Sequence, residues 1–352
     1  RSSIRVKNTS NVIISFSTAI QQINTVLLVI LGTYLIHSDD PHNRITMGAL
    51  IAAVILSGRA LAPLGQIASL ATRFQQARLA MQGVNEIVRR PVERESQTHY
   101  LTVKDIQGEF HFSAVTFFYK PELPAALKGM SVCIRPGEKV GIIGTIGCGK
   151  STLLKMMVGL YRQNKGQITL DGVAMQQLDP CFVRDKVFLL EQNPRLFLGT
   201  LRENLQLSRL PGSLSDVDMI NAAGRFGFDR FIRHHPCGLD MQIGEGGQGL
   251  SGGQRQMVAL TRMVLGSPRV VLLDEPTTGL DLQTENIVLK GLNHWSRGRT
   301  MVVVTHRLQM LNIVDRIIVM NEGRVMMDGP RDEILKKLSG KQQSGESRAI
   351  TS

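Results

Sequence analysis

A glycine-rich segment at residues 144–151 reads Gly-Thr-Ile-Gly-Cys-Gly-Lys-Ser. It follows an apolar run at 140–143, typical of a buried strand, and precedes a helical segment at 152–158. Glycines let consecutive backbone N–H groups close around phosphate oxygens, and the start of a helix adds partial positive charge. We expect Lys150 to reach the β- and γ-phosphates of a nucleotide and Ser151 to ligate magnesium. The segment therefore predicts a nucleotide-binding α/β domain.

A second motif, Leu-Ser-Gly-Gly-Gln at 250–254, comes shortly before an apolar run at 270–273 that ends in two acidic residues. A carboxylate at a strand end beside a phosphate loop commonly holds magnesium, which assigns Asp274 to the metal. The adjacent Glu275 is placed to orient or deprotonate an attacking water molecule. Two adjacent acidic residues are often only a solvated turn, but the upstream motif favours the catalytic interpretation.

Together these motifs resemble those of ATP-binding-cassette transporters, and the resemblance covers residues 109–338. It implies an α/β P-loop ATPase with a helical subdomain that binds ATP and Mg²⁺. In this family the 250–254 motif completes the ATP site of the opposite subunit, so the resemblance also implies a second copy of the chain in a homodimer. The implied ATP-binding residues are Tyr119, Gly144, Thr145, Ile146, Gly147, Cys148, Gly149, Lys150, Ser151, Thr152, Gln192, Ser251, Gly252, Gly253, Gln254 and Asp281.

Several single residues acquire roles only through this resemblance. Tyr119 matches an aromatic that stacks on adenine, the alternative being an ordinary strand tyrosine. Gln192 matches a glutamine that senses the metal and contacts the membrane domain, so the implied metal ligands are Ser151, Gln192 and Asp274. Asp281 lies in a loop that communicates across the dimer. His306, after the apolar run at 301–304, matches a switch histidine near the γ-phosphate, which makes Glu275 and His306 the implied catalytic residues.

The four cysteines form no CxxC pair and have no histidine at metal spacing, which indicates neither a disulfide framework nor a zinc site. Cys148 replaces the serine usual in this motif. Its place at a helix N-terminus near Lys150 favours the thiolate, so we expect it to be the most reactive of the four. The alternative is a sulfur that is packed inward and inert.

Residues 1–90 are expected to be the C-terminal part of a transmembrane domain. No charged residue occurs between residues 8 and 36, and the apolar stretch 12–36 exceeds the roughly 20 residues that a membrane-spanning helix needs. A second uncharged run at 45–58 follows a polar break, which predicts an α-helical transmembrane hairpin. The alternative for 12–36 is a long buried helix of a soluble protein.

Charge asymmetry orients this hairpin. Basic residues gather at both outer ends, whereas the loop at 37–44 holds Asp39 and Asp40 against a single Arg44. The positive-inside rule then places both ends in the cytoplasm and the loop outside it. Arg59 interrupts the second run and is expected to face other helices and not lipid.

Composition divides the rest of the chain. Residues 91–108 are charged and lack helical periodicity, which indicates a linker, and 339–352 are expected to be a disordered tail. Strands are expected at 140–143, 270–273, 301–304 and 317–320, and another at 186–190. This alternation of strands with helical stretches is typical of a parallel sheet.

Within the family, the chain most resembles the type I secretion permease and ATPase proteins of Gram-negative bacteria, which export unfolded proteins. The segments 56–64 and 238–245 carry this resemblance, and 244–247 resembles a loop specific to exporters. It implies a bacterial inner-membrane location with the ATPase domain in the cytoplasm, membrane lipid as a neighbour, and a periplasmic adaptor, an outer-membrane channel and an exported protein as partners. The alternative is a lipid, drug or peptide exporter with the same ATPase chemistry.

The formal net charge of +12 suggests either nucleic acid or an anionic membrane as a partner. Aromatic residues make up only 5% of the chain and do not alternate with basic residues, which disfavours single-stranded nucleic acid. A soluble cassette acting on DNA or ribosomes would lack the hairpin. A non-catalytic cassette would have lost Glu275 or His306, and both are present.

Overall fold

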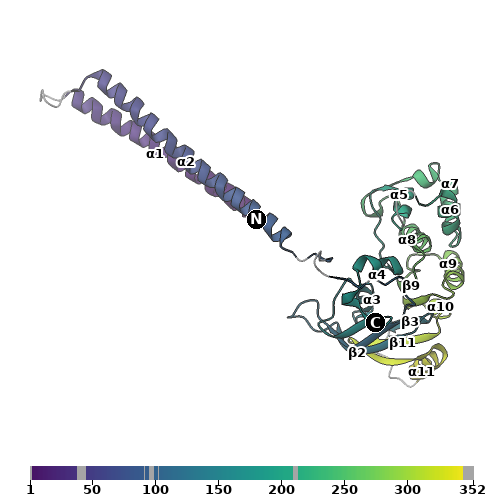
Figure 1. Ribbon diagram of the computed structural model, residues 1–352. Helices are drawn as coiled ribbons and strands as arrows, with labels where there is room; N and C mark the ends of the chain where they lie inside the picture. The colour runs from purple at the N-terminus through teal and green to yellow at the C-terminus, as the bar shows by residue number, and fades with distance from the viewer. Residues whose placement is uncertain are drawn as a thin grey trace. The chain divides into compact units, whose positions relative to one another are not determined.

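The computed structural model describes residues 2–37, 45–90, 92–94, 99–101, 103–208 and 213–343. The chain forms two compact units, residues 1–92 and 93–352, which Figure 1 shows.

The first unit is a helical hairpin of α1 (Ser2–Ile36) and α2 (Met47–Val88), which pack side by side along their length (Figure 1). Thr46 caps α2, because its hydroxyl accepts a hydrogen bond from the backbone N–H of Ala49 at 3.2 Å. A side chain on Gly32 would clash with Leu50, so this glycine lets the two helices approach closely. The predicted hairpin is confirmed, while its connecting loop at 38–44 lies outside the described residues.

The two helices of the hairpin differ in the length of their apolar segments. Among the described residues, one helical segment, Thr18–Ile36, is long and apolar enough to cross a membrane. In α2 the corresponding apolar part, Met47–Ala60, is shorter. Arg59 lies near the end of that part, and its charge limits how far the apolar run extends.

The second unit is built on a six-stranded sheet with the order β12-β11-β3-β10-β9-β6. Its strands are β3 (Lys139–Gly144), β6 (Val187–Leu190), β9 (Val270–Asp274), β10 (Thr300–Val304), β11 (Arg316–Asn321) and β12 (Arg324–Pro330). All neighbours are parallel except β11 and β12. The central strands are buried on both faces, which explains why they read as continuous apolar runs. The expected parallel sheet is confirmed.

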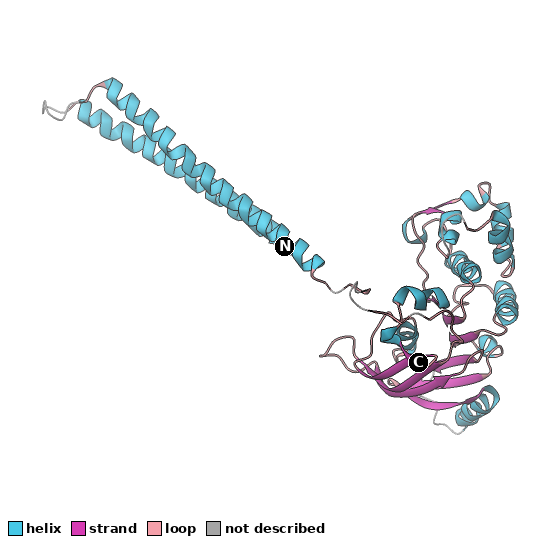
Figure 2. Cartoon of the chain, viewed as in Figure 1, coloured by secondary structure: helices cyan, strands magenta, loops and turns pink. Residues whose placement is uncertain are grey.

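A second, antiparallel sheet has the order β2-β1-β4-β5. Its strands are β1 (Phe110–Phe117), β2 (Leu127–Ile134), β4 (Lys165–Leu170) and β5 (Val173–Ala174). A core of buried side chains joins this sheet, α3 (Lys150–Met157) and one face of the parallel sheet, and it includes Phe110, Phe112 and Ile142. Figure 2 shows the strands of the unit gathered together with helices around them.

A helical subdomain packs against the other face through a second core that includes Met219, Phe226 and Leu260. Its elements are α5 (Leu201–Gln206), α6 (Asp216–Gly224), α7 (Asp229–His234), a 3₁₀ turn η2 (Gly238–Asp240), the short pair β7 (Gly199–Thr200) and β8 (Gln242–Ile243), a second turn η3 (Glu245–Gly247) and α8 (Gly252–Gly266). Helix α8 packs against α5, α6 and β6, which connects this subdomain to the parallel sheet.

The remaining elements surround the two sheets. They are η1 (Met175–Gln177), α4 (Pro180–Lys186), α9 (Leu282–Trp295), α10 (Leu308–Leu311) and α11 (Arg331–Gln343). Helix α11 continues through residues 339–343, which the sequence assigned to a tail, while 344–352 lie outside the described residues. In the expected linker, Leu101 pairs with Leu178, and its N–H donates to the carbonyl of Gln177 at 2.8 Å.

Candidate nucleotide-binding site

The predicted site residues come together because they follow neighbouring parallel strands. In the register of the sheet, Val304 at the end of β10 lies opposite Ile142 in β3 and Asp274 in β9. Parallel strands present their carboxyl ends at one edge of a sheet, and that edge is where such folds bind ligands. The glycine-rich loop after β3 and the segments after β9 and β10 therefore share this edge.

The glycine-rich loop folds around the ammonium group of Lys150, whose side chain is buried. Its Nζ donates hydrogen bonds to the carbonyl of Gly144 at 2.7 Å and to that of Thr145 at 2.9 Å. Ile146 lies at the tip of the loop and is 85% exposed. The loop is thus held by its own lysine, and its tip is open to solvent.

Two glycines in this loop cannot be replaced without moving the chain. Gly149 has φ 101° and precedes α3 directly, and a Cβ there would lie 2.5 Å from the carbonyl oxygen of Ala126. For Gly144 the corresponding distance to the carbonyl oxygen of Met320 is 2.1 Å. The backbone of the loop therefore packs directly on neighbouring backbone, which fixes the direction of its N–H groups.

Cys148 is placed differently from the sequence expectation. Its side chain is 2% exposed and belongs to the core beneath the loop, with Sγ 3.8 Å from Nζ of Lys150. Cys181 and Cys237 are exposed. The expectation of an accessible thiol in the phosphate loop is wrong, because a sulfur at this position packs inward as a small apolar group.

Tyr119 lies beside the first turn of α3. Its hydroxyl is 2.8 Å from the hydroxyl of Thr152, and its ring meets those of Phe117 and Tyr161 edge-on at 5.0 and 5.3 Å. The side chain remains about half exposed. A ring that is held on one side and open on the other has a free face for stacking.

Asp274 is buried at the end of β9, directly next to the loop. Burial raises the pKa of its carboxyl group, while a hydrogen bond from Ser151 and the charge of Lys150 act in the opposite direction. Among the described residues no three His, Cys, Asp or Glu side chains converge on a common point. The oxygens of Asp274 and Ser151 nevertheless suit Mg²⁺, which is commonly held by one carboxylate, a hydroxyl and phosphate oxygens. These two residues fit the metal.

Glu275 faces the segment after β10. Its Oε1 accepts a hydrogen bond from the backbone N–H of His306 at 3.1 Å, and Nε2 of His306 is 3.9 Å from the same oxygen. Burial raises the pKa of Glu275, and the charge of His306 opposes this shift. Glu275 itself has φ 50°, a left-handed conformation that a non-glycine residue adopts only at some cost. The two implied catalytic residues are therefore in contact.

The 250–254 motif forms the start of α8. Ser251 caps this helix in a capping box, in which its Oγ accepts from the N–H of Gln254 at 3.2 Å and Oε1 of Gln254 accepts from the N–H of Ser251 at 2.8 Å. Helix α8 packs mainly against α5 and α6, whereas the phosphate-loop helix α3 packs against β9 and β3, and both helices contact β6. A Cβ on Gly253 would lie 3.0 Å from the carbonyl oxygen of Gly279. Between the two capping residues, Gly252 and Gly253 carry no side chains.

Asp281 and Gln192 lie at the ends of other elements. Asp281 caps α9, accepting hydrogen bonds from the backbone N–H groups of Gln283 and Thr284, and from the hydroxyl of Thr284 at 2.7 Å. These bonds, led by the one from the Thr284 N–H, lower its pKa. Gln192 follows β6 and is exposed. Sequence reasoning missed the capping role, although an aspartate just before a helical stretch is its usual signal.

Sequence reasoning also missed three residues behind the site: Thr277, Glu285 and Arg307. Thr277 and Glu285 are both buried, at 0% and 2% exposure. Oε2 of Glu285 accepts a hydrogen bond from Nη1 of Arg307 at 2.6 Å. In sequence Glu285 is one acidic residue in the first turn of a helix, a common feature on solvated surfaces, so nothing local distinguishes it.

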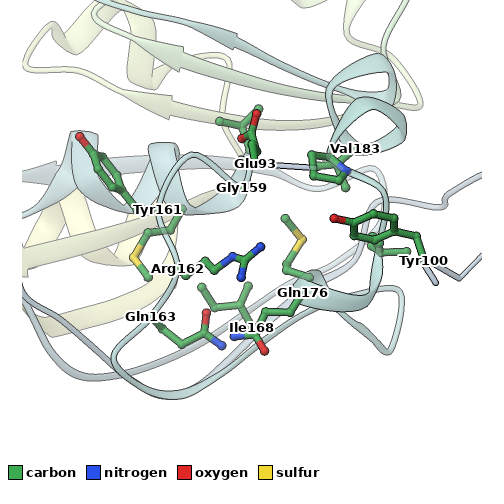
Figure 3. Close-up of a pocket in the computed structure, with 14 residues that line it drawn as sticks. Glu93, Tyr100, Gly159, Tyr161, Arg162, Gln163, Ile168, Gln176 and Val183 are labelled. Atoms are coloured by element: carbon green, nitrogen blue, oxygen red, sulfur yellow. The ribbon is translucent and has the colours of Figure 1, made fainter. Parts of the chain in front are cut away.

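A cavity of about 50 Å³ lies elsewhere in the second unit (Figure 3). Its walls come from the linker, the end of α3 and the segment leading into α4, and they include Glu93, Tyr100, Arg162 and Val183. None of the predicted site residues lines it. It is much smaller than the roughly 300–1,000 Å³ of small-molecule sites, so it is not the nucleotide site.

Comparison with known proteins agrees with this geometry. Residues 127–278 match the family model described as ABC transporter. The leukotoxin translocation ATP-binding protein of Mannheimia glucosida is 35% identical over 324 residues, and the toxin RTX-I translocation ATP-binding protein of Actinobacillus pleuropneumoniae is 34% identical over 321. Each alignment covers 91% of this chain but only 45% and 44% of the relative, so the chain spans less than half the length of these proteins.

A solved structure shares the fold of the whole chain. It is a bacterial Atm1-family ABC exporter with ATP bound, with a TM-score of 0.74 and 24% sequence identity, and the match covers 98% of this chain and 60% of that one. The likeness extends over both the helical hairpin and the α/β unit. Residues 127–278 therefore match the ABC transporter family, and the fold of the chain, helical hairpin included, is similar to that of an ABC exporter.

Proposed function

We propose that this chain binds MgATP at the edge of its parallel sheet and hydrolyses it. The observation that carries the proposal is the contact between Glu275 and His306 beside Asp274 and the glycine-rich loop. Asp274 and Ser151 would hold Mg²⁺, which supplies positive charge to the phosphates. Glu275 would accept a proton from the attacking water, and Lys150 would exchange its loop carbonyls for phosphate oxygens.

The test is phosphate release by the full-length protein in lipid nanodiscs. We expect ATPase activity that requires Mg²⁺ and that Lys150→Ala abolishes. The matched control is Lys165→Ala, which removes a lysine at the start of β4, in the antiparallel sheet. Activity that survives both EDTA and Lys150→Ala would contradict the proposal.

The active form is proposed to be a homodimer in which the 250–254 motif of each subunit closes the ATP site of the other. The start of α8 supports this role, since a helix N-terminus attracts an anion and Gly252 and Gly253 place no side chain there. Tyr119 would stack on the adenine, and Gln192 and Asp281 would lie near the shared site. Isologous contact of two copies is the simplest closed arrangement.

Mixing two inactive variants tests this dimer. A heterodimer of Lys150→Ala and Ser251→Arg has one site with both defects and one site with neither. Co-expression of the two variants should therefore restore about half of the activity in each heterodimer, whereas either variant alone stays inactive. Failure of the mixture to recover activity, with heterodimers shown by affinity tags, would contradict the shared site.

The transported substrate is proposed to be an unfolded protein, exported by type I secretion across a bacterial inner membrane. The relatives at 34–35% identity are toxin translocation proteins, which supports this class. A periplasmic adaptor and an outer-membrane channel would complete the pathway. The test is secretion of a repeat-toxin substrate by cells that carry the full-length gene with and without Glu275→Gln. Export of a lipid or drug without protein secretion would favour the alternative.

The hairpin is proposed to cross that membrane with both ends in the cytoplasm. The apolar segment Thr18–Ile36 and the charge asymmetry around the hairpin support this orientation. A cysteine at Ser38, which lies outside the described residues, should react with an impermeant thiol reagent in intact spheroplasts of cells that express the full-length protein. Reaction only after lysis would reverse the orientation.

A further inference from the structure

A buried carboxylate, that of Glu285 on α9, joins the segments after two neighbouring strands. Its Oε1 accepts a hydrogen bond from the hydroxyl of Thr277 at 2.9 Å, and its Oε2 accepts one from Nη1 of Arg307 at 2.6 Å. Thr277 comes two residues after Glu275, and Arg307 comes directly after His306. Each oxygen of Glu285 therefore holds one of the two segments that carry the proposed catalytic residues.

The contacts close into a ring. Glu275 leads along the backbone to Thr277, the hydroxyl of Thr277 donates to Glu285, and Glu285 holds Arg307. From Arg307 the backbone returns to His306, whose N–H donates to Glu275 at 3.1 Å. One further bond stiffens the ring on the β10 side, where the N–H of Arg307 donates to the hydroxyl of Thr305 at 3.0 Å.

Burial of the Glu285 carboxylate costs desolvation free energy, which the hydrogen bonds of this ring must offset. A carboxylate at 2% exposure has lost most of its hydration and is stable only when it is paired and hydrogen-bonded. Arg307 supplies the charge, because its side chain is 37% exposed and needs less desolvation than its partner. A leucine or a methionine would fill the same space without an ionic partner, so the carboxylate fixes geometry and not only packing.

The ring also helps to hold Glu275 in its strained backbone conformation. Glu275 has φ 50°, and its backbone N–H donates to the carbonyl of Val304 at 2.9 Å. A residue in the left-handed region keeps that conformation only where its surroundings determine it. Thr277 and Glu285 fix the chain directly after Glu275 and so provide that restraint.

We propose that Glu285 is a positioning residue for ATP hydrolysis: it holds the carboxylate of Glu275 and the backbone N–H of His306 in register through Thr277 and Arg307. This role rests on the proposed ATPase function. Glu285 does not touch the nucleotide, so its loss should lower turnover and leave ATP affinity unchanged. Small displacements of a catalytic group are sufficient for such an effect.

The experiment measures kcat, KM for ATP and equilibrium binding of ATP in the full-length protein in nanodiscs. Glu285→Gln keeps the size and one acceptor but loses the charge that holds Arg307. We expect kcat to fall about tenfold or more, with KM and ATP affinity within about twofold of the parent. Glu138→Gln is the matched control, since it removes a carboxylate that pairs with Arg316 away from the site, and its kcat should stay unchanged.

A second variant guards against misfolding. Glu285→Gln leaves Arg307 without its charged partner, so we also use the double variant Glu285→Gln with Arg307→Met, which removes both charges and leaves no unpaired ion. This variant should fold, bind ATP with parental affinity and still show the loss of kcat. A purely structural role would instead lower the folded fraction and ATP binding together.

Non-additivity separates positioning from a general defect. In the Glu275→Gln background, Glu285→Gln should lower the residual turnover no further. The effects of two substitutions are not additive when both residues act through the same catalytic group. Two results would overturn the positioning role while the ATPase function stands. One is a parental kcat in the variant with Glu285→Gln and Arg307→Met. The other is a further loss of kcat when Glu285→Gln is added to Glu275→Gln. A parent protein without ATPase activity would overturn the proposed function, and the positioning role with it.

Discussion

The backbone N–H of His306 donates a hydrogen bond to Oε1 of Glu275 at 3.1 Å. This bond joins the ends of two strands that lie side by side in the sheet, β9 and β10. It holds the carboxylate by a backbone group, whose position does not depend on the protonation or rotamer of the imidazole. A carboxylate fixed in this way is already in place before water arrives.

Substitution of Glu275 tests that role directly. Glu275→Gln keeps the acceptor for the His306 N–H but cannot take a proton from water. We expect kcat to fall by about 100-fold or more, since positioned bases contribute at least that much, while ATP binding persists. Phosphate release and binding of a fluorescent ATP analogue measure the two properties. Turnover within about threefold of the parent would remove Glu275 from the role of general base.

The raised pKa of Glu275 predicts an acid limb in the pH profile. The carboxyl group must be deprotonated to accept a proton, so kcat should fall as the pH drops through a value above 4.5, the ordinary pKa of glutamate. Burial also raises the pKa of Asp274 in the protein without nucleotide. The pH profile of the residual activity of Glu275→Gln should therefore lack the part of the acid limb that the titration of Glu275 produces.

The same shift has a consequence for stability. The folded pKa of Glu275 lies above the unfolded value, so the folded state binds more protons between the two, and this group's contribution to the free energy of unfolding falls as the pH rises through that window. Glu275→Gln removes this cost, and the nucleotide-free variant should unfold at a higher temperature than the parent at neutral pH. The gain should disappear below pH 4.5, and a gain that persists there would have another cause.

Gly149 allows a steric test of the phosphate loop. Alanine at this position would place its Cβ 2.5 Å from the carbonyl oxygen of Ala126 and would require φ 101°, so the loop must shift. We expect ATP affinity to fall about tenfold or more, because the N–H groups that face the phosphates move with the loop. Gly137→Ala is the control, since Gly137 has φ 72° and open space around it in the turn between β2 and β3.

The comparison of Gly149→Ala and Gly137→Ala separates the effect of a steric clash with neighbouring backbone from the effect of an unfavourable φ angle. Both changes place alanine in the left-handed region, which costs about 1–2 kcal/mol for a residue with a side chain. Only Gly149→Ala adds a collision with backbone. Equal ATP affinity in the two variants would mean that the loop tolerates the shift, and that its geometry is less restricted than the packing indicates.

The residues of the site that could be predicted from sequence are those fixed by strand order. Asp274, Glu275 and His306 follow apolar runs, and parallel strands bring such positions to one edge whatever the loops between them do. Glu285 could not be found in this way. It lies 8 residues from Thr277 and 22 from Arg307, and its burial follows from the packing of α9, which no local pattern expresses.

The direction in which a side chain points could also not be predicted from the sequence. The position of Cys148 next to Lys150 follows from the motif, but the direction of its sulfur follows from packing between the loop and the sheet. Helix α11 likewise continues past residue 338, to Gln343. A polar composition is compatible with either a tail or the exposed face of a helix.

Thiol labelling tests the placement of Cys148. With 2% of its side chain exposed, Cys148 should react with a maleimide reagent far more slowly than Cys181 and Cys237, which are exposed. Since burial alone sets this order, the slow reaction should be the same with and without MgATP, and ATPase activity should survive labelling of the two fast cysteines. Mass spectrometry of the labelled full-length protein identifies each site, and a variant with Cys181→Ser and Cys237→Ser isolates the slow reaction. Rapid modification of Cys148 in that variant, prevented by MgATP, would show that the loop opens in solution and exposes the thiol where the nucleotide binds.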